Sequence, residues 1–312
     1  MPRKPVSREV RGHDKSGEHV AAEVFAVWAL FALVAVGVTE TYARLPVSDL
    51  YHVSRSGLSG GFSRVLVFVD FPLALVAIAI ALIVLDRLGG RAAAFLTVLS
   101  IFLSAVVGWP GVVDQADLDA KAVNAVPALG VAIALALSAW AVWRRRVAFT
   151  PRLPLDPARV VTAAVLVIGA SPWLFAEAGF SVSDVPGLGR VFLGEQTRRG
   201  GGGESLQVVH LGHHHGADGV YLVLAALLLS RTLPHLGRLR GLLSAYLALM
   251  LAYGAANYVQ DFWTEQIVKR GWTERAIPSL LHPSLSLGWA AIVLLATCVE
   301  LGAFRWERRH SP

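Results

Sequence analysis

The segment that decides the fold runs from Phe62 to Leu85 and reads FSRVLVFVDFPLALVAIAIALIVL. Its second half, from Leu73 to Leu85, contains only aliphatic residues. A helix needs about 20 predominantly apolar residues to cross the hydrocarbon core of a bilayer. The segment is long enough, and we therefore predict that it forms a transmembrane helix.

The rest of the chain repeats this pattern, which predicts an all-α, polytopic membrane helix bundle of about eight spans. The expected spans are Val20–Tyr42, Phe62–Leu85, Arg91–Gly108, Val123–Trp143, Arg159–Ala176, Leu211–Leu229, Leu239–Phe262 and Leu280–Phe304. We expect one membrane domain from residue 18 to residue 305. A disordered cytoplasmic leader, residues 1–17, precedes it, and a cytoplasmic tail, residues 306–312, follows. One long extracytoplasmic loop is expected at residues 177–209.

Composition supports the membrane class. Hydrophobic residues make up 55% of the 312 residues and charged residues only 16%, whereas about a quarter of a soluble domain is charged. The net charge of +6 does not indicate nucleic-acid binding, because the basic residues lie mostly between the apolar runs. The single cysteine, Cys298, excludes an intrachain disulfide.

The distribution of basic residues predicts the orientation, because arginine and lysine favour the cytoplasmic side. Five alternate segments carry most of them: Arg3 to Lys15, Arg87 and Arg91, Arg144 to Arg159, Arg231 to Arg240, and Arg305 to Arg309. The intervening connections are mixed or acidic. We therefore expect both termini to be cytoplasmic in a multi-pass protein of the cell membrane.

Intramembrane ionisable residues mark candidate functional sites, because charge at membrane depth is costly. Asp70, Asp218 and Asp261 are the candidate catalytic residues, and all three fall in the outer halves of their spans. Asp218, for example, lies about 20 Å from Arg231 at a rise of 1.5 Å per residue. We predict a polar cavity open to the outside, with walls from spans two, six and seven. The alternative is that each carboxylate simply pairs with a neighbouring span.

Histidines crowd the start of span six, in the sequence His210-Leu-Gly-His213-His214-His215-Gly-Ala-Asp218. On one helix His210, His214 and Asp218 would share a face, with His213 beside it. These four residues are the predicted ligands of a divalent transition metal: zinc, iron or copper. The expected supporting residues are His215, Asn257 and His282. A pH-responsive or adventitious histidine patch remains the alternative.

The sequence His210-Leu-Gly-His213-His214 resembles a histidine box of the membrane fatty-acid desaturases and hydroxylases. That family needs further boxes, and the chain contains no second cluster of this kind. Its boxes also face the cytoplasm, whereas these histidines are expected outside. Membership is therefore rejected.

Three classes of function follow. The first is a metal-dependent enzyme acting on a lipid or small molecule at the outer leaflet, with the bilayer as its surroundings and no nucleic-acid partner. The second is an ion, metal or proton-coupled transporter, and the third is a non-catalytic assembly subunit. A transporter needs a polar route to the cytoplasm, and the inner halves offer little beyond Glu300, Thr97, Ser100 and Ser138. A one-sided site is therefore favoured.

Overall fold

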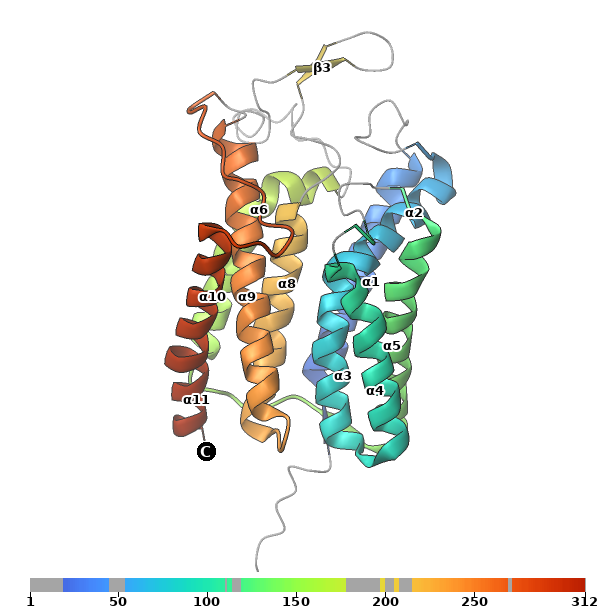
Figure 1. The fold of residues 1–312 in the computed structure, drawn as a ribbon, viewed down its shortest axis with the longest axis vertical. Helices are drawn as coiled ribbons and strands as arrows, with labels where there is room; N and C mark the ends of the chain where they lie inside the picture. Colours follow the sequence, from blue (N-terminus) through green and yellow to red (C-terminus); the bar gives the residue numbers. More distant parts are fainter. Residues whose placement is uncertain are drawn as a thin grey trace, which may run out of the picture.

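The computed structural model describes residues 19–44, 54–109, 111–113, 119–177, 197–199, 205–207, 215–268 and 271–311. Most of the described chain is helical, and the long helices run roughly side by side along one axis (Figure 1). The expected leader, residues 1–17, and most of the expected loop at 177–209 lie outside the described part.

The first half of the chain supplies five α-helices and their short extensions. They are α1 (Ala22–Arg44), α2 (Gly57–Phe68), η3 (Val69–Leu73), α3 (Ala74–Leu88), α4 (Gly90–Ala105), η4 (Val106–Gly108), η5 (Ala122–Asn124) and α5 (Ala125–Arg144). The helices α2 and α3 form one continuous rod through η3, a π-helical turn that contains Pro72. Proline lacks a backbone N–H, so a change of hydrogen-bond pattern at this point is expected.

The described part of the second half contains a further set of helices. They are α6 (Asp156–Glu177), α8 (His215–Ser230), η6 (Leu233–His235), α9 (Arg240–Phe262), η7 (Trp263–Val268), α10 (Leu287–Cys298), η8 (Val299–Phe304) and α11 (Arg305–His310). The last helix begins later than the expected Leu280, because Ser286 caps it by accepting a hydrogen bond from the Trp289 backbone N–H over 3.3 Å. It then continues to His310, into the expected tail.

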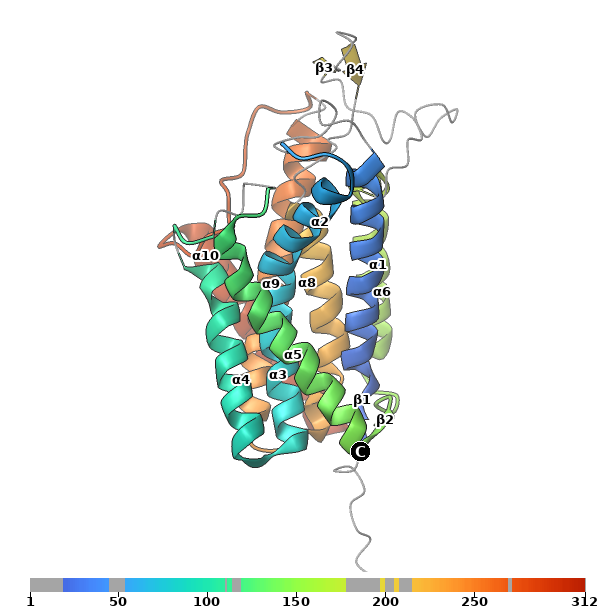
Figure 2. The ribbon, with the colours of Figure 1, turned by 90° about the vertical axis from the view of Figure 1, so that its right-hand side faces the viewer.

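Short strands accompany the helices. The strand β1 (His19–Ala21) pairs in parallel with β2 (Arg146–Ala148) near the end of the bundle that holds the C-terminus (Figure 2). The strands β3 (Thr197–Arg199) and β4 (Ser205–Gln207) form an antiparallel pair beyond the opposite end (Figure 1). They are small additions to a helical protein.

Six of the described helical segments are long and apolar enough to cross a membrane: Ala22–Arg44, Gly57–Leu88, Gly90–Gly108, Ala122–Arg144, Arg240–Val268 and Leu287–His310. Each overlaps an expected span. The other two expected spans correspond to α6 and to α8, of which the apolar part Gly216–Ser230 is shorter. The helices identify a multi-pass membrane protein of the predicted all-α class.

The helices form two groups that follow the order of the chain. In the first, α1 packs on α2, and α3, α4 and α5 pack on one another; in the second, α8 lies between α6 and α9, and α10 packs on α9. The groups meet where α8 touches α1, η3 and α3. The helix α8 is therefore central, which explains why its side chains are so extensively buried although its apolar part is shorter than each of the six candidate spans.

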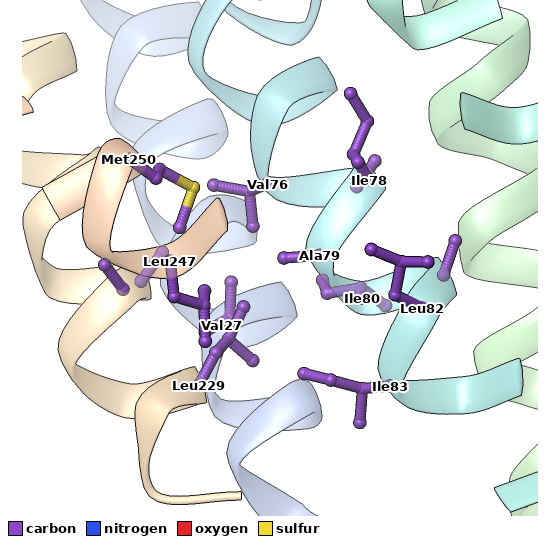
Figure 3. Packing of buried hydrophobic residues seen from close by; sticks show 14 of the residues in the cluster. Val27, Val76, Ile78, Ala79, Ile80, Leu82, Ile83, Leu229, Leu247 and Met250 are labelled. Atoms are coloured by element: carbon purple, nitrogen blue, oxygen red, sulfur yellow. The ribbon is translucent and has the colours of Figure 1, made fainter. Parts of the chain in front are cut away.

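A dry core fills the middle of this junction. Every residue of α3 from Ala74 to Val84 except Leu75 is buried. Its side chains pack with residues of α1, α8 and α9, among them Val27, Leu229 and Leu247 (Figure 3). Such packing is the main source of helix association in a membrane, where lipid is as apolar as the core.

The helices α8 and α9 approach most closely at a pair of glycines. A Cβ atom on Gly219 would lie 2.5 Å from the carbonyl oxygen of Gly254, and one on Gly254 would lie 2.9 Å from the oxygen of Gly219. Small residues at such crossings let two backbones touch. The glycines therefore set the distance between the two helices that carry Asp218 and Asp261.

Candidate functional site

The first turn of α8 and the last turns of α9 carry three of the expected site residues. Asp218 and Asp261 are each 6% exposed, and Asn257 is fully buried. One turn separates Asn257 from Asp261 on α9, and the crossing at Gly219 places Asn257 against α8. The predicted grouping of spans six and seven around these residues agrees with this packing.

Asp261 has a definite contact. Its Oδ2 atom accepts a hydrogen bond from the backbone N–H of Gly216, at a distance of 3.0 Å. The first N–H groups of a helix have no partner within the helix, and a carboxylate also favours the positive end of the helix dipole. Asp261 thus caps α8 from the neighbouring helix, which is a positioning role. Its predicted catalytic role is untested.

Asp218 faces a charge that the sequence analysis overlooked. Arg64 of α2 is 3% exposed and lies close enough to Asp218 to stabilise its negative charge. The Cζ atom of Arg64 also lies 5.7 Å from the centre of the Tyr42 ring, a cation–π distance. An arginine inside an expected span, two residues from its start at Phe62, was the available signal.

Asp70 lies in η3, the turn that follows α2. It is 1% exposed, and within the described part neither carboxylate oxygen has a hydrogen bond of standard geometry. Its polar neighbour is Asn124, at the start of α5, and α5 packs against η3. The turn η3 packs against α8, span six, as well as against α5, span four. The partner predicted for Asp70 on span six or seven therefore stays a prediction.

A cavity of about 230 Å³ has Arg64 among its lining residues. Four helices wall it: Val34 and Val38 of α1, Arg64 of α2, Val167 of α6 and Tyr221 of α8 are among its lining residues. Its walls are almost wholly apolar. This apolar cavity lies between spans one, two, five and six, and the polar cavity expected between spans two, six and seven stays a prediction.

The predicted metal ligands are only partly covered by the structure. His210, His213 and His214 lie outside the described residues, and α8 begins at His215, whose side chain also lies outside them. His282 is exposed in the loop before α10. Among the residues that the structure describes, no group of three histidine, cysteine or acidic side chains is arranged to hold a metal ion. The metal site remains a prediction.

The opposite end of the bundle carries buried charged side chains, whereas the sequence predicted little polar character in the inner halves of the spans. Glu23, at the start of α1, is fully buried and accepts hydrogen bonds from Arg231 at 3.1 Å and from the backbone N–H of Thr150 at 3.0 Å. Arg231 also pairs with Asp156 at the start of α6. No local sequence signal indicates this network, because the partners are 75 to 208 residues apart in the chain.

A second pair extends this network. Arg159 of α6 donates two hydrogen bonds to Glu307 of α11, at 2.8 and 2.5 Å, and contacts Asp156 at 3.2 Å. Bidentate pairing of this kind is the strongest geometry for arginine and a carboxylate. The network ties α1, α6, α8 and α11 together at the end that carries most of the arginines.

The network changes the titration of Asp156. Partial burial acts to raise the pKa of Asp156, but the backbone N–H of Leu153 and the charges of Arg231 and Arg159 outweigh it and hold that pKa below its ordinary value of 3.8. Burial likewise acts to lower the pKa of Arg231, and Asp156 and Glu23 raise it overall. Both shifts favour the charged forms.

Comparisons with known proteins provide no family. No family model, curated protein or solved structure matches the chain.

Proposed function

We propose that this chain is an eight-span cell-membrane protein that acts from its outer side on a lipid or another small molecule, at a metal site formed by the histidine run and Asp218. Both termini are cytoplasmic in this proposal, and α6 and α8 are counted as spans. Metal-dependent hydrolysis or oxidation is the chemistry that such a site would support.

The observation that carries a one-sided site is the dry core between two charged layers. Asp70, Asp218 and Arg64 lie towards one end of the bundle, and the Glu23–Arg231 network lies at the other. The buried apolar stretch of α3, from Val76 to Val84, separates them. This separation supports chemistry on one side more than passage of an ion through the bundle.

The metal proposal rests on the residues at the start of α8. His214 precedes α8 directly, and Asp218 lies in its first turn. The hydrogen bond from Gly216 to Asp261 fixes that turn against α9. His210, His213, His214 and Asp218 are the proposed ligands, and such a nitrogen and oxygen set suits zinc, iron or copper.

Proton-coupled or metal transport is the second candidate. The observation that favours it is charge in both halves of the membrane domain, with the Arg64–Asp218 pair near one end and the buried Glu23 at the other. Transport would require the dry core to open during the cycle. Enzyme and transporter differ in their products, since only a transporter moves the ion across a sealed vesicle.

Elemental analysis tests the metal proposal. Tag-free protein purified without chelators should contain close to one zinc, iron or copper per chain. His214→Ala and Asp218→Asn should each lose the metal, whereas His235→Ala, at the opposite end of α8, should retain it. Wild-type protein that neither contains nor takes up any of these metals stoichiometrically would remove the enzyme proposal. Ion flux into vesicles would then favour transport.

A further inference from the structure

The cavity between α1, α2, α6 and α8 is lined mainly by apolar side chains, together with two polar ones. Its volume of about 230 Å³ equals that of roughly eight water molecules in the liquid. Leu30, Val34 and Val38 line it along α1, and Val167 and Leu174 line it along α6. Such walls do not favour water, because apolar cavities tend to stay dry or to bind apolar molecules.

Two polar side chains, those of Arg64 and Tyr221, are among the lining residues of this cavity. Arg64 brings a guanidinium group, which matches carboxylate and phosphate oxygens better than any other side chain does. Tyr221 is 3% exposed, and its hydroxyl group is buried with no hydrogen-bond partner within the described part of the chain. A buried hydroxyl group without a partner is costly, so an oxygen atom from a ligand would satisfy it.

The cavity borders the surface that faces lipid. Val167, one of its lining residues, is 42% exposed. On either side, α1 exposes Leu33 and Val36, and α6 exposes Val160 and Ile168. The helices α1 and α6 contact each other and lie together in the side view (Figure 2). A molecule dissolved in the bilayer can therefore reach the cavity without passing through water.

We propose that the cavity binds one acyl chain of an anionic amphiphile, whose carboxylate or phosphate head lies at Arg64 and Tyr221. The inference rests on the proposed function and specifies its substrate class. Tyr221 lies one helical turn from Asp218, so the bound head group would lie next to the proposed metal ligand. Arg64 would bridge the head group and Asp218, since a guanidinium group has five N–H donors.

Photolabelling in lipid nanodiscs tests this. The probes are a diazirine-bearing fatty acid, a matched fatty alcohol, and a phosphatidylglycerol with the diazirine in one chain. The fatty acid should label peptides of α1, α6 and α8 at the cavity. Val34→Trp fills the cavity and should lower this labelling about tenfold. Leu33→Trp adds the same side chain on the lipid side of the same helix and should leave the labelling unchanged.

The roles of the two polar lining residues, Arg64 and Tyr221, are tested separately. Tyr221→Phe and Arg64→Gln should weaken labelling by the fatty acid several-fold but leave labelling by the alcohol as it is, and Arg64→Lys should restore part of the difference. Should Arg64→Gln fail to fold, Tyr221→Phe still decides. Equal labelling by acid and alcohol in the wild type would overturn the anionic head. The phosphatidylglycerol probe distinguishes a membrane phospholipid from a free fatty acid as the source.

Metal content in the same samples keeps the two proposals distinguishable. Diffuse labelling over all lipid-facing helices, unchanged by Val34→Trp, would overturn the cavity proposal even with a full complement of metal. Cavity labelling in a protein without metal would support the amphiphile site and remove the metal chemistry beside it.

Discussion

The carboxylate of Asp261 in α9 accepts a hydrogen bond from the backbone N–H of Gly216 in the first turn of α8. An acid from one helix thus caps its neighbour, 45 residues away in the chain. The contact fixes the turn that carries Asp218. The geometry of the proposed site therefore depends on Asp261 even if this residue never touches a metal or a substrate.

Removing this cap should destabilise the protein. Asp261→Ala leaves the Gly216 N–H buried without its acceptor, and we expect a loss of about 1–2 kcal/mol in the free energy of unfolding. Thermal unfolding in a mild detergent measures the loss. The control is Gln260→Ala, one residue away on the same helix. Equal stability of the two variants would show that the cap contributes nothing.

The glycine crossing should not tolerate a methyl group. Gly219→Ala places a Cβ atom 2.5 Å from the Gly254 carbonyl oxygen, so α8 and α9 must move apart. Overpacking of this kind costs about 1–3 kcal/mol. Gly302→Ala, with open space around it, serves as the control. We expect a lower unfolding temperature and a lower folded yield for Gly219→Ala alone, and a normal Gly219→Ala protein would contradict the packing.

Asp70 allows a test of function against stability. Its carboxylate is buried and has no standard hydrogen bond in the described part of the protein, so keeping it is costly. Asp70→Asn should leave the unfolding temperature unchanged or raise it, and impair whatever activity the protein has. A drop comparable to that of Asn124→Ala would instead mean that Asp70 and Asn124 form a structural pair.

The network of Glu23, Arg231 and Asp156 should lose part of its stabilising effect at low pH. Because the folded state holds the pKa of Asp156 below 3.8, its stabilising effect is fully present above that value. It is lost as the pH falls below about 4 and passes through the folded-state pKa. Asp156→Asn should therefore flatten the fall in unfolding temperature at low pH, whereas Glu274→Gln in an exposed loop should leave it steep. Parallel curves for Asp156→Asn and wild type would contradict this.

The fold was predictable because a membrane imposes one simple rule. A membrane-spanning helix must satisfy its own backbone hydrogen bonds and present about 20 apolar residues. Stretches such as Phe62–Leu85 show this requirement within their own sequence. Helix ends were less predictable. The structure extends this span back to Gly57, where Gly61 packs so closely on α1 that a Cβ atom would lie 2.5 Å from the carbonyl oxygen of Thr39. No local signal encodes such a contact.

The candidate site was predictable in part. The depth of Asp218 and Asp261 follows from counting residues along their helices. The identity of their neighbours does not, because it depends on which helices touch. Arg64 was overlooked for that reason, and the buried Glu23 was not singled out either. Sequence spacing predicts a shared face on one helix, whereas contacts between helices require the fold.

Accessibility of single cysteines from the two sides tests the central claim, an outward-facing site, most directly. In a Cys298→Ala background, Ser205→Cys lies in β4, at the end of the bundle where α8 begins, and Ser311→Cys follows α11 at the other end (Figure 1). A membrane-impermeant thiol reagent applied to intact cells should label Ser205→Cys at once, and Ser311→Cys only after the membrane is breached. The reverse pattern would turn the Asp218 end towards the cytoplasm and contradict the account.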